Sequence, residues 1–426
     1  MKLARIGLDN RYYALFLFFI VAIFNYIDRS ILTVLQVPIK AELGLSDTQL
    51  GLLTGLGFAL FYTLMGLPLA RLTDRAVRKY MIAGALATWS LMTALSSLAT
   101  GFGSLLTLRI GVAVGEAGSV PGTHSMISDY FPPERRASAI ALWGLAVPIG
   151  TMIGIASGGW LATHVGWRQA FLIVGVAGML LAPVVLLTLH EPKRGRLDPP
   201  GLTNAALPSM GEAMRLLWRL KAFRYLSIGG ATHVFAQAAM QSWAAPFYTR
   251  VHGMAIGEAA LYVALLNGLF GGVGILAGGW LSERWGRRDP AGYLLVPGIA
   301  SLIAAPTVIA QLLAPTQQIS LMIGVIPAIA VACYVAPVTA VSQSLVPPQM
   351  RALTAAMLIL TINLVGIGLG PSVTGAVSDA LLPHLPQPGA SLRYALCLAT
   401  AAELISVFFF FKAAGHLRRE AAARAR

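Results

Sequence analysis

Charged residues are scarce in this sequence. Only 11% of its 426 residues are Asp, Glu, Lys or Arg, and 57% are hydrophobic, whereas soluble domains carry about 25% charged residues. The apolar runs show no strict alternation with polar residues, which excludes a soluble protein built on half-buried strands. Long apolar runs are instead typical of a chain that crosses a bilayer repeatedly, because each helical crossing takes roughly 20 mostly apolar residues.

Motifs for covalent chemistry are also missing. There are two cysteines, Cys333 and Cys397, and both lie in apolar runs, where we expect them to serve packing. We find no Gly-Lys-Ser/Thr loop for nucleotide phosphates and no closely spaced His, Cys and Glu residues for a metal. We therefore expect no enzymatic activity, no bound metal and no cofactor, with an ion gradient as the energy source.

Acidic residues number 17 against 31 basic ones. Because the basic residues lie in short stretches between apolar runs, their excess indicates membrane topology rather than nucleic-acid binding. If the N-terminus lies inside, 25 of the 31 Lys and Arg residues fall on the inner side and four on the outer side. This bias predicts a multi-pass protein of the inner or plasma membrane with both termini in the cytoplasm.

Twelve apolar runs are long enough to span a bilayer as helices. They lie at about 12–36, 48–70, 80–100, 103–128, 137–162, 168–189, 223–250, 257–281, 291–313, 318–345, 352–380 and 392–412. A polar segment separates the sixth run from the seventh. The twelve runs and this segment together predict an all-α membrane fold of two six-helix bundles. The first bundle covers 1–190, a cytoplasmic linker covers 191–222, and the second bundle with a cytoplasmic tail covers 223–426. We expect a monomer.

An internal repeat relates the two predicted bundles. In each, the loop after the second span carries an acidic residue followed by three basic ones, at an offset of 209 residues. These residues are Asp74, Arg75, Arg78 and Lys79 in the first copy, and Glu283, Arg284, Arg287 and Arg288 in the second. The Pro-Pro pair at 132–133 recurs at 347–348 with nearly the same offset, 215. Parallel repeats of this kind place a substrate site where the halves meet, near the midplane.

The two loops resemble the signature of the major facilitator superfamily, although Ala70 and Val77 replace glycines of that signature in the first copy. Three stretches resemble the Spinster-like proteins, transporters of sphingosine-1-phosphate and lysophospholipids. They are Asn25-Tyr26-Ile27-Asp28-Arg29, Gly115-Glu116-Ala117 and Ser128-Asp129-Tyr130-Phe131-Pro132. The resemblance implies a twelve-helix secondary transporter that works by alternating access, with the charged loops as cytoplasmic latches. The same basic residues also serve as topology signals.

Two carboxylates lie inside predicted spans, Asp28 in the first and Glu116 in the fourth. A charge at the bilayer centre costs about 2.5–3.5 kcal/mol on insertion scales and is usually functional. We interpret both as proton carriers. The alternatives are a structural ion pair of Asp28 with Arg29 or Arg109, and a neutral Glu116 that locks helix packing.

Arg109 precedes Glu116 by seven residues, so both lie on one face of the fourth span, roughly 10 Å apart. We expect Asp28 to approach this face, since the resemblance places spans one and four along the cavity. Arg109 would then exchange between the two carboxylates and an anionic substrate group, which its planar fork suits. Arg29 points about 100° away from Asp28 around the helix, and either lines the cavity or packs between helices.

Polar side chains also form a stripe in the seventh span, at His233, Gln237 and Gln241. With ionisable groups in one half and mildly polar ones in the other, the predicted cavity suits an anionic amphipathic substrate such as a lysophospholipid or a sphingoid phosphate. Two alternatives stay open. One is a proton symporter of small organic anions such as sugar acids, and the other is a passive lipid scramblase or channel.

Small residues repeat every four positions in the fifth span, at Gly150, Gly154 and Gly158. Such spacing allows two helices to approach closely. The family resemblance places this helix where the two halves meet on the outer side, so we interpret the stripe either as a surface that rearranges during transport or as static packing.

Overall fold

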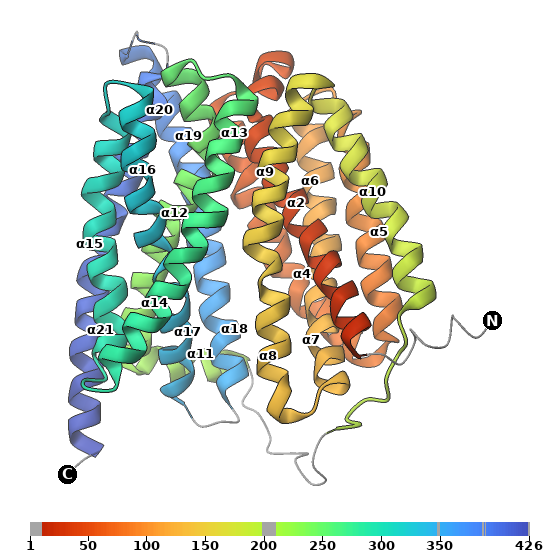
Figure 1. Ribbon diagram of the computed structural model, residues 1–426, viewed down its shortest axis with the longest axis vertical. Coiled ribbons are helices and arrows are strands. Elements are labelled where there is room, and N and C mark those ends of the chain that lie inside the picture. Colours follow the sequence, from red (N-terminus) through yellow and green to blue (C-terminus); the bar gives the residue numbers. More distant parts are fainter. Residues whose placement is uncertain (1–10, 198–209, 347–349, 386, 388, 425–426) are drawn as a thin grey trace. The chain divides into compact units, whose positions relative to one another are not determined.

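The computed structural model describes residues 11–197, 210–346, 350–385, 387 and 389–424. Within these ranges the chain forms helices joined by turns, and no described residue lies in a strand. The chain divides into two compact units, Met1–Thr203 with Ala255–Ala264, and Asn204–Met254 with Leu265–Arg426. The division after Thr203 falls inside the segment predicted as a linker. In each unit the long helices run side by side (Figure 1).

The first unit is built mainly from the helices of the first half of the chain. They are α2 (Arg11–Leu43), α3 (Asp47–Thr54), α4 (Leu56–Arg75), α5 (Arg78–Ser96), α6 (Phe102–Ala117), α7 (Ser119–Tyr130), α8 (Pro133–Gly144), α9 (Ala146–His164) and α10 (Trp167–Thr188). Three predicted spans are each divided into two helices, at Gly55, Gly118 and Leu145. The start of α3 is fixed by a capping box, because Ser46 Oγ accepts from the Gln49 backbone and Gln49 Oε1 accepts from the Ser46 backbone.

The second unit contains the remaining helices. They are α11 (Met210–Arg219), α12 (Lys221–His252), α14 (Gly271–Gly286), α15 (Gly292–Leu313), α16 (Gln317–Ala332), α17 (Val335–Ser344), α18 (Arg351–Thr361), α19 (Leu369–Leu381), α20 (Ala390–Thr400) and α21 (Ala402–Arg424). Helix α13 (Ile256–Leu265) leads into α14 through a π-helical turn, Leu266–Phe270, and a second π-helical turn, Ile362–Gly368, joins α18 to α19.

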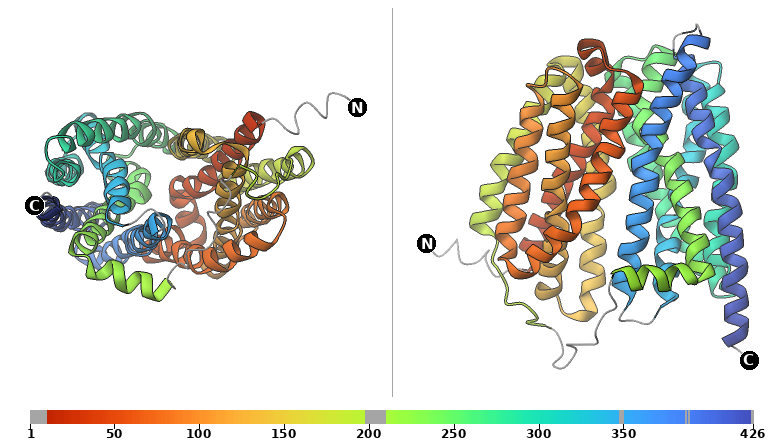
Figure 2. Two further views of the ribbon diagram at one scale, coloured as in Figure 1. Left: turned by 90° about the horizontal axis from the view of Figure 1, so that it is seen from below. Right: turned by 180° about the vertical axis from the view of Figure 1, so that it is seen from behind.

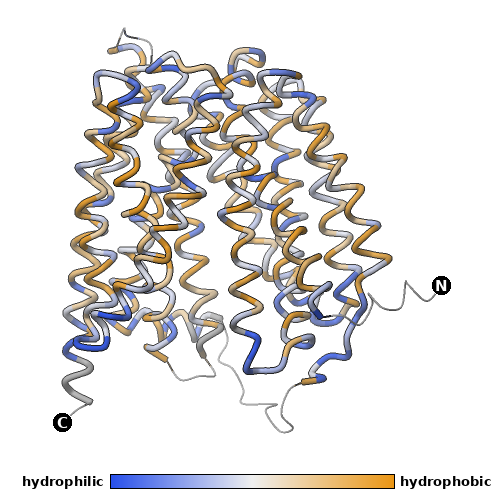
Figure 3. Tube along the Cα trace, viewed as in Figure 1, coloured by the Kyte–Doolittle hydropathy of each residue, from blue (hydrophilic) through white to orange (hydrophobic). Residues whose placement is uncertain are grey.

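Nine helical stretches in the described part of the chain are long and apolar enough to cross a membrane. The three other predicted spans, 80–100, 103–128 and 223–250, are largely helical as well but more polar. Two of them carry the candidate site residues Arg109, Glu116 and His233. Hydrophobic residues follow the middle of the helices and hydrophilic ones gather at the ends (Figure 3). The predicted all-α membrane fold with twelve spans is confirmed.

One helix is absent from the sequence prediction. Helix α11 lies within the segment 191–222 that we predicted as a plain linker, and it packs on α12 and α18. Its Leu217 is fully buried, whereas Arg215 and Arg219 are exposed. It runs crosswise to the long helices of its unit (Figure 2). The rest of the linker, 198–209, and the second Pro-Pro loop, 347–349, lie outside the described residues.

The glycine stripe of the fifth span faces α2 within the first unit. A Cβ atom placed on Gly154 would lie 2.3 Å from Ser30 Oγ and 2.7 Å from Ile27 Cα, and one on Gly150 would lie 2.8 Å from Ile23 O. The absence of side chains therefore lets α9 touch the backbone of α2 beside Asp28. This contact lies within the first unit and fits the static-packing interpretation of the stripe.

Candidate functional site

The first ion pair of the site joins α2 to α6. Asp28 and Arg109 are both only 2% exposed, and Arg109 Nη1 lies 3.7 Å from Asp28 Oδ1. The same nitrogen donates to the Asp28 backbone oxygen at 3.4 Å. From α5, Thr93 Oγ1 donates to Asp28 Oδ1 at 2.5 Å. Three helices therefore hold this carboxylate, which is stabilised by one cation and one hydroxyl.

The second ion pair involves the next residue of α2. Arg29 Nε donates to Glu116 Oε2 at 2.6 Å. Glu116 is fully buried, whereas 24% of the Arg29 side chain is exposed. Consecutive residues of α2 thus contact residues two turns apart on α6. The sequence placed Arg109 and Glu116 on one face of this helix, and the structure gives each of them its own partner from α2.

Aromatic rings of α4 complete the surroundings of the arginines. The Arg29 guanidinium carbon lies 4.5 Å from the ring centroid of Tyr62 and 4.8 Å from that of Phe58. Arg109 lies 5.6 Å from the same Phe58 ring. A cation over a ring face is stabilised by roughly 0.5–2 kcal/mol. The exposed part of Arg29 is therefore flanked by apolar, polarisable surface.

Two polar atoms of this cluster have no hydrogen-bond partner among the described residues. They are Glu116 Oε1 and Arg109 Nε, and both are buried. A buried unsatisfied polar group costs about 1–3 kcal/mol. The four charges balance, yet one carboxylate oxygen can still accept a proton and one guanidinium N–H can still donate to an anion.

The charged loop of the first unit is partly a buried structural network. Asp74 and Arg75 are exposed, but Arg78 is fully buried and pairs with Asp129 at the end of α7. Arg78 Nε also donates to Glu191 Oε1 at 2.7 Å, and the backbone N–H of Lys79 donates to Glu191 Oε2 at 2.9 Å. Arg78 therefore joins the ends of α5, α7 and α10.

The corresponding loop of the second unit differs. Arg287, the counterpart of Arg78, directly follows α14 and donates to Glu283 in the last turn of that helix at 2.6 Å, and both side chains are more than half exposed. Arg284 and Arg288 are also exposed. The nearby Asp289 pairs with Arg418 of α21, and this bond lowers the pKa of the half-buried Asp289 carboxyl. The two loops are therefore similar in sequence but differ in structure: the first holds a buried ion-pair network and the second an exposed ion pair.

The polar stripe of α12 becomes less buried along its length. His233 is fully buried, Gln237 is half-buried and Gln241 is exposed. The His233 ring is enclosed by α15, α16 and α21, where it contacts Glu403, a residue that the sequence analysis did not single out. An acidic residue inside the predicted span 392–412 is a signal that could have identified it.

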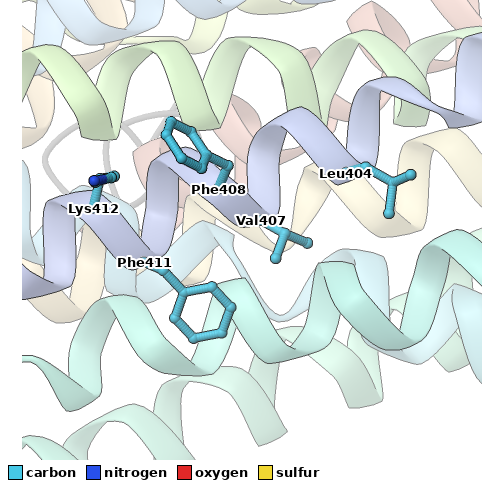
Figure 4. Close-up of a pocket in the computed structure, with 5 residues that line it drawn as sticks. All are labelled: Leu404, Val407, Phe408, Phe411 and Lys412. Atoms are coloured by element: carbon cyan, nitrogen blue, oxygen red, sulfur yellow. The ribbon is translucent and has the colours of Figure 1, made fainter.

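A groove of about 520 Å³ lies on α21 of the second unit, whereas both ion pairs belong to the first unit. Leu404, Val407, Phe408 and Phe411 line it, with Lys412 at one end (Figure 4). Leu404 and Phe408 are more than half exposed. An apolar face on a membrane-spanning helix is expected to contact lipid tails, so we do not assign this groove to the transport site.

The fold and the paired charges at membrane depth define a class, the helical transporters with ionisable residues inside their spans. The chain matches the model of the Major Facilitator Superfamily over residues 18–420 and belongs to that family. It is therefore a multi-pass integral membrane protein of a transporter family.

Individual relatives narrow the resemblance. An MFS-type efflux pump of Mycolicibacterium smegmatis is 33% identical over 408 residues, which cover 96% of this chain and 93% of the pump. A crystal structure of a bacterial homologue of the human lysosomal transporter Spinster, inward-facing and unoccupied, is 35% identical with a TM-score of 0.87 and covers 96% of this chain and 97% of that chain. The hexuronate transporter of Bacillus subtilis is 26% identical over 377 residues, 85% of this chain and 86% of the transporter. The predicted Spinster-like resemblance is confirmed.

Proposed function

We propose that this protein is a proton-coupled secondary transporter of an anionic amphipathic substrate, of the lysophospholipid or sphingoid-phosphate class. The observation that carries the proposal is the pair of buried ion pairs Asp28–Arg109 and Glu116–Arg29. Ionisable residues inside membrane spans usually mark substrate or proton pathways, so this arrangement supports a transporter that exchanges partners between protons and an anion.

Coupling of substrate binding to proton uptake depends on whether each carboxylate is paired with an arginine. While Arg29 holds Glu116, the carboxylate stays ionised, because the paired charges stabilise each other in a low-dielectric site. An anionic substrate that binds Arg29 removes this partner. A buried carboxylate without a cation is more stable protonated, so Glu116 takes up a proton as the substrate binds. Asp28 and Arg109 repeat the same logic one residue away.

The substrate class follows from what surrounds Arg29. Its guanidinium is the more exposed of the two, and its fork suits a phosphate or carboxylate. The Tyr62 and Phe58 rings beside it suit an apolar or cationic portion of the same molecule. The resemblance to the Spinster-like proteins, to which the solved bacterial homologue also belongs by its description, supports this class. Gln237 and Gln241 of α12 remain proposed substrate contacts, whereas the enclosed His233 offers no surface in this structure.

A second candidate is a proton symporter of small organic anions such as sugar acids. The similarity to a hexuronate transporter favours it. Purified protein separates the two, because a lysophospholipid should displace a bound fluorescent lysolipid, whereas a hexuronate should not. Displacement of the bound lysolipid by the hexuronate but not by the lysophospholipid would favour the sugar-acid symporter over our proposal. Displacement by the lysophospholipid but not by the hexuronate would exclude the symporter.

Replacing Arg29 with Lys should weaken substrate binding by about 1.5–3 kcal/mol, the range for a hydrogen bond to a charged group. Lys keeps the charge but loses the planar fork and the ring stacking. Arg109→Lys should have a smaller effect, because Arg109 is only 2% exposed. Titration of lysophospholipid onto purified variants measures this, with the exposed Arg287→Lys as control. An Arg29→Lys variant that binds like the wild type would reduce Arg29 to a structural role.

Cutting the proposed cytoplasmic latch should favour an inward-facing state. Asp74 is exposed at the end of α4, beside the basic residues Arg75 and Lys79. Asp74→Asn removes its charge without touching the buried network of Arg78. We expect faster labelling of cysteines introduced on the cytoplasmic side of the cavity, and the same direction for Glu283→Gln. Unchanged labelling in both variants would leave these loops with a topological role alone.

A further inference from the structure

The second unit holds a buried pair of ionisable residues that the proposed mechanism does not use. His233 of α12 is fully buried and Glu403 of α21 is 1% exposed. His233 Nδ1 lies 2.9 Å from Glu403 Oε2 and 3.0 Å from Ser301 Oγ of α15. His233 Nε2 lies 2.9 Å from the backbone oxygen of Val331 in α16. Four helices therefore meet at one imidazole.

Hydrogen-bond chemistry fixes where the protons are. The Val331 oxygen can only accept, so His233 Nε2 must carry a proton and donate it. Nδ1 then faces a carboxylate oxygen at hydrogen-bond distance, and one proton must lie between them, on Nδ1 or on Oε2. The pair is thus neutral with one shared proton. Glu403 Oε1 is buried without a partner among the described residues, so it has room for a second proton.

No other charged side chain among the described residues compensates a change in the charge of this pair. No Lys or Arg in the described ranges forms an ion pair with Glu403. The ionisable side chain packed on the His233 ring is Tyr334, at 4.4 Å between centroids, while the neighbouring Cys333 directs its thiol to Ile329 O. Gain or loss of one proton therefore changes the net charge of an enclosed site, which is costly unless the surrounding helices move.

The partners of the pair lie at helix breaks. Val331 is among the last four residues of α16, whose carbonyls lack regular partners inside the helix, and the chain turns at 333–334 before α17. Glu403 is in the first turn of α21, directly after the turn at Ala401. The continuous helix α12 thus ties the break of span ten to the break of span twelve through His233.

We propose that His233 and Glu403 form a second proton-binding site of this transporter, and that its proton occupancy sets the angle between α16 and α17. A second proton on Glu403 makes this residue a neutral carboxylic acid. The shared proton then stays on His233, whose ring becomes a positive imidazolium. The bond from Nε2 to Val331 O is then the link through which the added charge acts on the break in span ten. The site is independent of the ion pairs in the first unit and of the substrate.

Infrared difference spectroscopy of the full-length protein in nanodiscs, without substrate, tests the proton site. A pH step between about pH 8 and pH 5 should produce the C=O band of a protonated carboxylic acid. One component of this band should be missing in Glu403→Gln and present in Glu116→Gln. A band in Glu403→Gln identical to that of the wild type would overturn the proposal. If Glu403→Gln does not fold, His233→Gln serves instead, and it should shift the band, whereas an unshifted band would overturn the proposal.

A distance measurement tests the consequence for span ten. Spin labels at Met322→Cys on α16 and Thr339→Cys on α17, both exposed positions, are placed in a variant with Cys333 and Cys397 replaced by Ala. The distance should change with pH and become independent of pH in Glu403→Gln or His233→Gln. A distance that ignores pH with both residues intact, or that follows pH equally in the two variants, would overturn the proposal. Asp28 and Glu116 stay intact in every spin-labelled variant, and the comparison with Glu403→Gln isolates the contribution of the second site, so failure of the proposed transport mechanism would not alter this distance readout.

Discussion

Glu116→Gln is expected to reduce proton-driven substrate movement in proteoliposomes to background, and Asp28→Asn should do the same. Each substitution imitates the protonated carboxyl and leaves Arg29 or Arg109 without its exchange partner. The proton can then neither bind nor leave, so the gradient no longer drives the cycle. Substrate binding should persist, because Arg29 is released rather than removed.

The control for these variants is Glu134→Gln, which removes an exposed carboxylate at the start of α8. Its gradient-driven flux should match that of the wild type. Binding assays on the same preparations separate a coupling defect from misfolding. If both Glu116→Gln and Asp28→Asn keep their full response to an imposed pH gradient, proton coupling through these residues is wrong.

Arg78→Gln is expected to destabilise the first bundle by about 3–5 kcal/mol, the cost of removing one partner from a buried charge pair. Asp129 would lose its cation while it stays 5% exposed, and Glu191 would lose one of its two bonds to this loop. Arg287→Gln is the matched control at the repeat-related position. Because the Arg287 side chain is 74% exposed, its loss should cost less than about 0.5 kcal/mol.

Thermal denaturation of the two purified variants in one detergent compares them directly. We expect a clearly lower midpoint for Arg78→Gln and an unchanged midpoint for Arg287→Gln. Equal midpoints would mean that the buried network around Arg78 does not stabilise the first bundle, and the loop would then serve only topology or gating.

The architecture was predictable because bilayer physics constrains it strongly. Apolar runs of roughly 20 residues leave little choice besides helices, and their number and the repeat indicate the superfamily. Interruptions at Gly55, Gly118 and Leu145 were not predicted, since hydropathy does not report where a helix is divided. Helix α11 was also missed, because its polar face made the segment resemble a linker.

The site was predictable in its residues and less so in its pairing. Asp28, Arg109 and Glu116 were identified from the cost of burying charge. The sequence placed Arg29 and Asp28 about 100° apart around the helix, which describes the directions in which the side chains leave the helix but not how far they reach. The long Arg29 side chain instead reaches Glu116 at 2.6 Å, two turns along α6 from Arg109.

Asymmetry between the repeats was the other limit. Aligning Arg78 with Arg287 shows that both positions carry a basic residue. The alignment does not show whether a carboxylate lies near enough to pair with each arginine. The 215-residue offset of the second match places Ser344 opposite Asp129, so the second unit has no carboxylate at that position to bury its arginine. His233 appeared to be part of a stripe along one helix, and its partner Glu403 lies 170 residues further along the chain, beyond the reach of periodicity.

The central claim, coupling of an anionic amphipathic substrate to protons, is tested most directly by wild-type flux. Purified protein in proteoliposomes is given a labelled lysophospholipid with and without an imposed pH gradient, at zero membrane potential. We predict that the gradient drives net movement and that substrate addition alone moves protons, because in the proposed mechanism Arg29 exchanges Glu116 for the substrate. Flux that ignores the gradient and occurs without proton movement would contradict the account and point to passive or Na⁺-driven transport.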